Sequence, residues 1–400
     1  MARLIEITGK ALSGEWGTDD ETGEGIPVLR TTNFTNEGVV NYNDVVTRKI
    51  TKKNINDKFL RKGDIIIEKS GGSDKFPVGR VIYFDGVENT YLFNNFTGLL
   101  RVKDREVWYP RYIFYSLYAN YKRGGTRSFE NKTTGLHNLK TDTYVEQFEV
   151  GEKSKKEQVS ICNKLDKLHD VMKLREQELQ MLNDLIKARF VEMFGGSDSE
   201  LNRWKQEPLG NICKRVKRYP TFCNMEYLES GVRVIRIGNI LQDGHMDVED
   251  KNYVFVYEKA NDDFPETIIE RNDIVMAVRG DGSAASRIGI ITEEKLIGAN
   301  ISPNLIRMQA DSEKILPLFF FYYLTGEVGQ KRLDSYVNKT AKKNIAAKDI
   351  VKVMTPIPPL DIQRQFVSLV EQVNKSKVVV QKALDETQIL FNSLMQQYFG

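Results

Sequence analysis

The chain has 400 residues, a formal net charge of +3, an apolar fraction of 40% and a charged fraction of 28%. This length allows two or more domains with proper cores, and the composition is typical of soluble proteins. No apolar run approaches the roughly 20 residues that a membrane-spanning helix needs, so a membrane-spanning class is excluded.

The N-terminal residues and the cysteines indicate the compartment. Met1 leads into "ARLIEITGK", which lacks the pattern of a signal peptide. Cys162, Cys213 and Cys223 form no CxxC pair and are odd in number. We therefore expect a reducing cytoplasm, no disulfide framework and no metal site.

The first predicted element is a head, residues 1–152. Short β-branched stretches such as "DIIIE" and "RVIYF" alternate with Gly, Asn and Asp, and the aromatic-rich stretch "PRYIFYSLYAN" follows as a helix. This pattern predicts a compact α/β head with a mixed, partly antiparallel sheet.

The second element is a tail, residues 153–196, which contains neither Pro nor Gly between Ser154 and Phe194. Apolar residues alternate at spacings of four and three, with Arg175 and Arg189 as polar exceptions, and this spacing predicts a coiled-coil helix about 60 Å long. Gly195 and Gly196 end it. The stripe consists of Ile161, Leu165, Leu168, Met172, Leu179, Leu182, Ile186 and Met193.

A second head, residues 197–358, and a second tail, residues 359–400, follow the same plan. The head has "DIVMAV" and "RIGIIT" and the aromatic stretch "PLFFFYYLTGE", and prolines set off the tail. Lys377 and Thr387 are the polar exceptions on its stripe. The second stripe consists of Phe366, Val370, Val373, Val380, Leu384, Phe391, Leu394 and Tyr398.

The two halves are diverged copies of one unit of roughly 200 residues, which is the kind of self-similarity to seek first. "VLRTTNF" at Val28 matches "VIRIGNI" at Val234, and "ENKTTGLHNL" aligns with "VNKTAKKNI", at offsets of 206 and 207 residues. The order of the matches is preserved throughout the chain. Equal stripes in equal repeats predict that the two tails pair with each other. The alternative is that two unrelated amphipathic helices each pack on their own head.

Positive charge gathers in one loop of each head. Residues 121–140 and 329–343 each carry a formal charge of +4, so the rest of the chain sums to −5. A focused basic patch is the footprint expected for phosphate contact, and asparagine can read adenine through two hydrogen bonds. A solvated surface is the alternative, which repetition in both copies disfavours.

A Gly/Ser-rich loop also recurs, as "EKSGGSDKFPVGRV" and "VRGDGSAASRIGI". Glycines allow close approach of the backbone to a ligand. Lys69 and Arg279 enter the two loops at equivalent points, and Arg80 and Arg287 end them. We interpret both loops as further candidates for ligand contact.

The sequence contains no GxxxxGK[ST], GxGxxG or HExxH motif. A nuclease site could start from Asp281 with Glu293-Glu294-Lys295, but the first copy has no Glu-x-Lys there. His137, His169 and His245 have no neighbour in sequence that suggests catalysis. Two rival hypotheses remain, a nuclease that acts alone and a scaffold whose basic loops contact acidic proteins.

The chain resembles, over essentially its whole length, the specificity subunits of type I DNA restriction-modification systems. The resemblance rests on the head–tail order, the openings "GIPVLRTTNF" and "GVRVIRIGNI", the loops "KGDIIIEKSGG" and "RNDIVMAVRGDG", and "PPLDIQRQF" at the second tail. It implies two target recognition domains and two long helices that pair as an antiparallel coiled coil. Each domain would read half of a split DNA sequence, and the helices would fix the gap.

The resemblance also implies a non-catalytic subunit that binds double-stranded DNA, two methyltransferase subunits and the restriction subunits. S-adenosylmethionine, Mg²⁺ and ATP would bind to those partners and not to this chain. The residues expected to contact DNA in the first head are Arg30, Thr32, Asn33, Lys69, Ser70, Ser73, Lys75, Arg80, Lys122, Arg123, Arg127, Lys132, Thr133, Asn138 and Lys140. Those in the second head are Arg236, Asn239, Arg279, Ser283, Ser286, Arg287, Lys331, Arg332, Lys339, Thr340, Lys342, Lys343 and Asn344.

Overall fold

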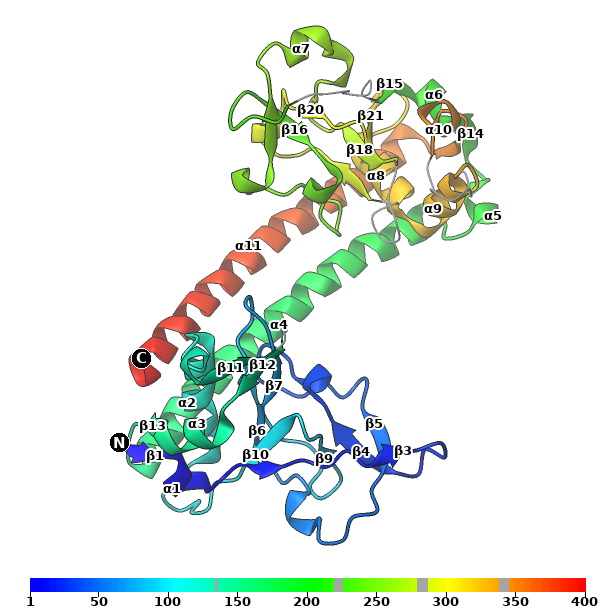
Figure 1. Cartoon of the computed structure of the whole chain (residues 1–400). Helices are drawn as coiled ribbons and strands as arrows, with labels where there is room; N and C mark the ends of the chain where they lie inside the picture. The colour runs from blue at the N-terminus through cyan, green and yellow to red at the C-terminus, as the bar shows by residue number, and fades with distance from the viewer. Residues whose placement is uncertain (134–135, 219–225, 279–286, 338–344) are drawn as a thin grey trace. The chain divides into compact units, whose positions relative to one another are not determined.

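A computed structural model describes residues 1–133, 136–218, 226–278, 287–337 and 345–400 (Figure 1). The chain forms two compact units, one of residues 1–176 with 382–400 and the other of residues 177–381. Each unit therefore contains one head and a piece of both tails. In the described part of the chain no helix is long and apolar enough to cross a membrane.

The first head is built from antiparallel and mixed sheets. One four-stranded sheet has the order β2-β10-β6-β8 and is antiparallel throughout, and another has the order β3-β5-β4-β9, in which β4 and β9 are parallel. A two-stranded pair, β1 with β13, joins the two ends of the head. The strands are β1 (Ala2–Arg3), β2 (Leu12–Ser13), β3 (Thr18–Asp19), β4 (Ile26–Leu29), β5 (Val46–Lys49), β6 (Ile65–Glu68), β8 (Val81–Tyr83), β9 (Leu92–Phe93), β10 (Thr97–Leu100) and β13 (Glu149–Val150).

The aromatic stretch of the first head forms helix α2 (Pro110–Lys122), which packs against β8. Proline suits the first turn because it has no N–H to satisfy there. Tyr112, Phe114 and Leu117 of this helix are buried in the core that the head shares with the tail helices. The head also contains two shorter helices, α1 (Leu4–Thr8) and α3 (Thr141–Gln147).

The second head repeats this arrangement. Its antiparallel sheet has the order β15-β21-β18-β19, its mixed sheet the order β17-β16-β20, and β14 pairs with β22 as β1 does with β13. Helix α8 (Pro317–Thr325) takes the place of α2. The remaining elements are α5 (Asp198–Leu201), β14 (Lys205–Pro208), α6 (Leu209–Ile212), β15 (Cys213–Arg218), β16 (Val232–Ile235), β17 (Val254–Val256), α7 (Ala260–Asp263), β18 (Ile274–Ala277), β19 (Ile288–Ile290), β20 (Asn300–Ile301), β21 (Leu305–Ala310), α9 (Glu327–Asp334), α10 (Ala347–Ile350) and β22 (Met354–Ile357).

The two predicted tails form helices of equal length, α4 (Lys155–Phe194) and α11 (Leu360–Phe399). Helix α4 starts with a capping box, in which Ser154 and Glu157 bond each other's backbone N–H groups at 3.3 and 2.9 Å. Helix α11 starts directly after Pro359, and Gly195 follows the end of α4 with a φ of 113°. These local signals explain why the first tail starts without a proline pair.

Within each unit the two tail helices run antiparallel. In the first unit Ile161 and Leu165 share a core with Phe391 and Met395, and in the second Ile186 and Phe190 share one with Phe366 and Val370. All sixteen residues of the two stripes are buried or half-buried. The predicted fold class, mixed α/β heads with paired antiparallel helices, is confirmed.

Two of the four polar exceptions on the stripes, Arg175 and Thr387, also meet. In the first unit Arg175 donates hydrogen bonds to Thr387 Oγ1 and to the Ala383 carbonyl. A polar pair in an apolar seam costs stability but penalises a shifted register, because a shift would leave the arginine buried without partners.

Candidate nucleic-acid interface

The structure joins the two candidate loops of the first head into one three-stranded sheet. Strand β7 (Ser70–Gly72) comes from the Gly/Ser loop, and β11 (Glu130–Thr133) and β12 (Leu136–Leu139) come from the basic loop. The strands are antiparallel in the order β11-β12-β7, with Asn138 opposite Ser70 (Figure 1). We call this element the loop sheet.

A buried histidine anchors the loop sheet. His137 Nδ1 lies 2.9 Å from Glu130 Oε2, and its Nε2 lies 3.5 Å from Asp74 Oδ1. The other oxygen of Glu130 accepts a 3.0 Å hydrogen bond from the Val78 N–H. His137 thus ties β12 to β11 and to the turn after β7, which is a structural role that its sequence neighbours did not indicate.

That turn, residues 73–77, is a tip held by hydrogen bonds. The Ser73 N–H donates to the Phe76 carbonyl at 2.7 Å, and the Phe76 N–H donates to Ser73 Oγ at 3.1 Å. Arg127 donates to the carbonyl groups of Asp74 and Lys75 at 3.2 and 3.5 Å. Arg127 therefore holds the tip in shape, besides adding positive charge beside it.

The tip presents an aromatic ring that the sequence analysis missed. The side chain of Phe76 is 59% exposed, and the Lys75 ammonium lies 5.3 Å from the centre of its ring. An exposed aromatic beside a cation is suited to stacking on a nucleic-acid base. The missed signal was the Lys-Phe pair inside a glycine-flanked turn.

The remaining candidates of the first head differ in exposure. Thr32, Ser73, Lys122 and Lys140 are exposed, whereas Ser70 and Asn138 are half-buried. Arg123 donates to the Phe399 carbonyl at the end of α11, at 2.5 Å, where a cation also complements the helix dipole. The backbones of Lys132 and Thr133 lie in β11.

Lys69 stands at the edge of the loop sheet. Its Nζ donates a 3.1 Å hydrogen bond to Ser13 Oγ, and its backbone carbonyl accepts from the Leu139 N–H at 2.9 Å. Burial lowers the pKa of its ammonium, because desolvation disfavours the charged form.

The repeated asparagines Asn33 and Asn239 are not on a surface. They are 1% and 2% exposed, and each amide oxygen accepts a 2.8 Å hydrogen bond from the N–H of the residue three positions earlier. Their amide nitrogens donate to the Asp44 and Asn252 carbonyls at 3.0 Å. Both asparagines close an internal turn, so the structure does not support their prediction as DNA contacts.

The arginines of the same motifs are also tied to their own heads. Arg30 pairs with Asp44 at 2.9 Å, and Arg236 donates to the Asn252 carbonyl at 3.1 Å. Arg80 donates to the Phe34 and Thr31 carbonyls at 2.9 Å each, and Arg287 donates to the Ile240 carbonyl at 3.1 Å. These four half-buried arginines are bonded within their own heads, so the structure does not support their prediction as DNA contacts.

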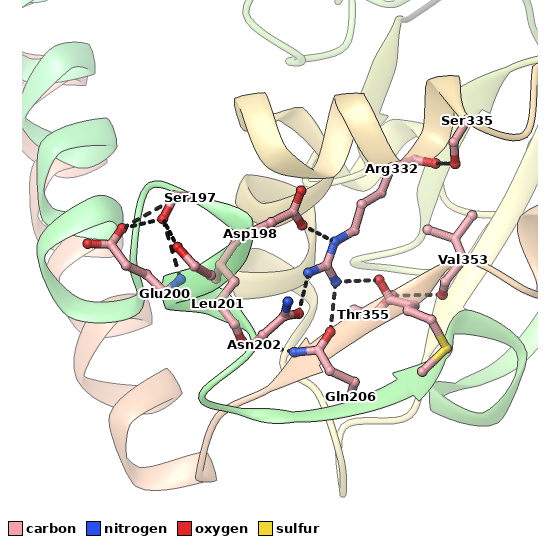
Figure 2. Close-up of polar contacts among 12 residues, drawn as sticks. Ser197, Asp198, Glu200, Leu201, Asn202, Gln206, Arg332, Ser335, Val353 and Thr355 are labelled. Carbon is pink, nitrogen blue, oxygen red and sulfur yellow. Dashed lines mark hydrogen bonds and ion pairs between the residues drawn. The ribbon is translucent and has the colours of Figure 1, made fainter.

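Arg332 has a structural role as well (Figure 2). Its guanidinium donates to Asp198 Oδ1 at 2.8 Å, Asn202 Oδ1 at 2.9 Å, Gln206 Oε1 at 2.7 Å and the Met354 carbonyl at 2.8 Å. These bonds use the guanidinium within the second head, so the structure does not support its prediction as a DNA contact. Its neighbour Lys331 is exposed and pairs with Glu327 at 2.6 Å.

The other predicted contacts of the second head lie outside the described residues. These are Arg279, Ser283, Ser286, Lys339, Thr340, Lys342, Lys343 and Asn344.

The nuclease hypothesis finds no support in the described part of the chain. Lys295 contacts Asp250 and the Val248 carbonyl, and Glu294 pairs with Arg271. Among the residues with described positions, no group of three or more His, Cys, Asp or Glu side chains could hold a metal ion. Asp281 lies outside those positions.

The chain thus contains two copies of a mixed α/β head, each followed by a long helix. The family model of the type I restriction modification DNA specificity domain matches residues 4–184 and 202–386. The chain therefore belongs to this family and contains its domain twice, which confirms the resemblance identified from the sequence.

The curated relatives have the same description. The chain is 26% identical over 196 residues to the type I restriction enzyme EcoBI specificity subunit of Escherichia coli, covering 48% of this chain and 40% of that protein. It is 23% identical over 294 residues to the MjaVIII specificity subunit of Methanocaldococcus jannaschii, covering 68% and 67% of the two chains. The first alignment thus spans less than half of the E. coli protein.

Solved structures share the fold. An S subunit of a type I restriction-modification system from M. genitalium has a TM-score of 0.56 at 17% identity, covering 100% of this chain and 95% of its own. A chain from a structure of type I R-M complex assembly and conformational transition has a TM-score of 0.58 at 16% identity, covering 100% and 96%. At these identities the likeness shows the fold.

Proposed function

We propose that this chain is the DNA-recognition subunit of a type I restriction-modification enzyme. Each head reads one half of a split target in double-stranded DNA, and the paired tail helices set the gap between the halves. The chain itself catalyses no reaction.

The observation that carries this proposal is the loop sheet of the first head. It gathers hydroxyl and amide side chains, Ser70 and Asn138, with the exposed cations Lys75 and Lys140 near its ends. Cations neutralise phosphates, and hydroxyl and amide groups can bond base edges. A surface that combines both functions is suited to reading DNA sequence.

The partners follow from the family. We infer that the chain holds two methyltransferase subunits and, through them, the restriction subunits. S-adenosylmethionine, Mg²⁺ and ATP bind to those partners. Because the two heads differ in sequence, we expect the two half-sites of the target to differ as well.

Mapping of methylated adenines tests this function. The full chain is expressed with its methyltransferase subunit in cells without other adenine methylation, and methylated positions are sequenced across the genome. A two-part motif with a fixed gap is expected. A contiguous motif, or methylation without sequence preference, contradicts the proposal.

The rival functions have their own readouts. The purified chain with Mg²⁺ should leave a supercoiled plasmid intact, whereas a nuclease would nick it. Binding of the chain to DNA should weaken steeply with salt, since each released phosphate counterion contributes about 0.9 to the slope. A scaffold for acidic proteins would show no such binding.

A further inference from the structure

Each tail helix carries a fully buried glutamine in its first turn. Gln158 in α4 and Gln363 in α11 are both 0% exposed. A side-chain amide has two donors and two acceptor sites, and it is costly to bury unless they are used. The contacts of these two amides therefore show what they are for.

Gln158 joins the first head to the first tail helix. Its Oε1 accepts a 2.8 Å hydrogen bond from the N–H of Tyr109, the residue that caps α2. Its Nε2 donates to the Val107 carbonyl at 3.0 Å and to the Lys153 carbonyl at 2.9 Å. One amide thus binds the start of the head's aromatic helix and the start of the tail helix.

Gln363 makes the same three bonds in the second unit. Its Oε1 accepts from the N–H of Leu316, the cap residue of α8, at 2.8 Å. Its Nε2 donates to the Lys314 carbonyl at 3.2 Å and to the Pro358 carbonyl at 2.7 Å. In both units the acceptors lie two residues before the cap and five residues before the glutamine.

The two glutamines make the same bonds although their neighbours in sequence differ. The residues around the two glutamines differ, with "KKEQVS" in one tail and "LDIQRQ" in the other, yet the three bonds coincide. General packing would not require the same three bonds in both copies. The shared feature is the fixed relation between the first turn of a head helix and the first turn of a tail helix.

The geometry points to Gln158 and Gln363 as positioning residues, which set the angle at which each head leaves its tail helix. This role rests on the proposed function: by fixing the angle of each head, the two glutamines restrict the length of the gap that the protein accepts between its two half-sites. One added base pair moves a half-site by about 3.4 Å and turns it by about 34°. A head held at a fixed angle rejects that change, whereas a loosened head tolerates it.

The test uses Gln158→Met and Gln363→Met, singly and together, in the full chain with its methyltransferase subunit. Methionine has similar length but makes none of the three bonds. Gln372→Met, an exposed position on α11, is the matched control. Methylation is measured on DNA that contains the mapped half-sites at the native gap and at gaps one base pair shorter and longer.

The expected result is an unchanged pair of half-sites with a relaxed gap. The ratio of methylation at altered gaps to methylation at the native gap should rise on the order of ten-fold, as expected when a buried hydrogen-bonded group is lost. The Gln372→Met control should keep the native ratio. Reduced stability alone would lower methylation at all gaps together and leave the ratio unchanged.

Folded variants with an unchanged gap ratio overturn this role of the glutamines. If Gln158→Met does not fold, Gln158→Asn replaces it, because asparagine keeps the amide but has a shorter side chain. A rise in the gap ratio of this variant supports the role, and an unchanged ratio overturns it. If the unmodified chain directs no split-site methylation at all, the proposed function fails instead. The two failures are therefore distinguished by the unmodified chain.

Discussion

Some asparagine and arginine side chains of this protein form hydrogen bonds within a head, and others lie at its surface. The surroundings of each side chain, and not its residue type, determine its role. Asn33 and Asn239 close buried turns, whereas Asn138 lies half-buried on the loop sheet opposite Ser70. The residue types are identical, but the bonding capacity of the buried pair is used within the head. Their substitution therefore has a different expected result from that of the surface residues.

Asn33→Ala and Asn239→Ala should each destabilise the chain. The change leaves the N–H of Arg30 or Arg236 without its acceptor, at a cost of about 1–3 kcal/mol. Urea denaturation measures the loss. Asn138→Ala serves as the comparison, and a change in target sequence without a loss of stability in Asn33→Ala would contradict the structural role.

The exposed lysines of the first head should act through phosphates. Replacing Lys75, Lys122 and Lys140 together with Ala should weaken DNA binding and flatten its salt dependence by at most about three units of slope. The control replaces Lys173, Lys187 and Lys375, which are exposed on the tail helices. Equal slopes in the two triple variants would rule out a phosphate role for the head lysines.

The exposed ring of Phe76 should contribute to DNA binding by stacking. Phe76→Ala should weaken binding by about 1–3 kcal/mol, the range measured for base–aromatic stacking. Phe76→Tyr keeps the ring and should bind nearly as the unmodified chain does. Titration of fluorescent DNA measures both, and equal affinities for Ala and Tyr would remove Phe76 from the interface.

The tail helices were predictable from sequence, and the loop sheet was not. A heptad stripe is a local pattern that continues over 40 residues, so periodicity reveals it. The pairing of Ser70 with Asn138 joins distant segments whose side chains show no alternating pattern. Likewise the sequence alone places Arg332 among the surface cations, because its partners Asp198 and Asn202 are more than 100 residues away.

A charge in the seam of the tail helices should be strongly destabilising. Leu384 packs against the core of the first unit, and Leu384→Asp should cost about 2–4 kcal/mol because it replaces apolar packing with a carboxylate that loses solvation in the seam. Ile389→Asp, at a 69% exposed position on the same helix, is the control. Thermal unfolding compares the two, and equal melting temperatures would contradict the helix pairing.

Leu182→Asp places the charge in the second unit, where Leu182 packs against the other core. Both this variant and Leu384→Asp should lose assembly with the methyltransferase subunits, measured by size-exclusion chromatography. Normal assembly of both variants would show that the helix pairing does not support the partners.

At the scale of the whole molecule, a head together with the tail that follows it does not form a complete unit, because each unit also needs part of the other tail. The core of the second unit includes Ile186, Phe190 and Phe194 of α4. A fragment of residues 197–400 therefore lacks one wall of that core and keeps the apolar stripe of α11 unpaired. An exposed apolar stripe of this length favours association.

This fragment should form a dimer in which two copies of α11 pair antiparallel about a twofold axis. With the methyltransferase subunit it should direct methylation of a palindromic split site, each half equal to the half that the second head reads. Analytical ultracentrifugation gives the mass, and methylation mapping gives the site. A monomer, or an asymmetric site, would contradict the arrangement.

The division of the chain also determines which residues must be synthesised before each unit can be completed. The first unit needs residues 382–400, and its core contains Phe391 and Met395 next to Ile161 and Leu165. A chain emerging from the ribosome can thus close its second unit before its first, although the first head is made earlier. Until the last turns of α11 appear, the apolar face of the start of α4 stays open to other chains and to chaperones. The unit that contains the first head therefore depends on residues 382–400, which are synthesised long after that head.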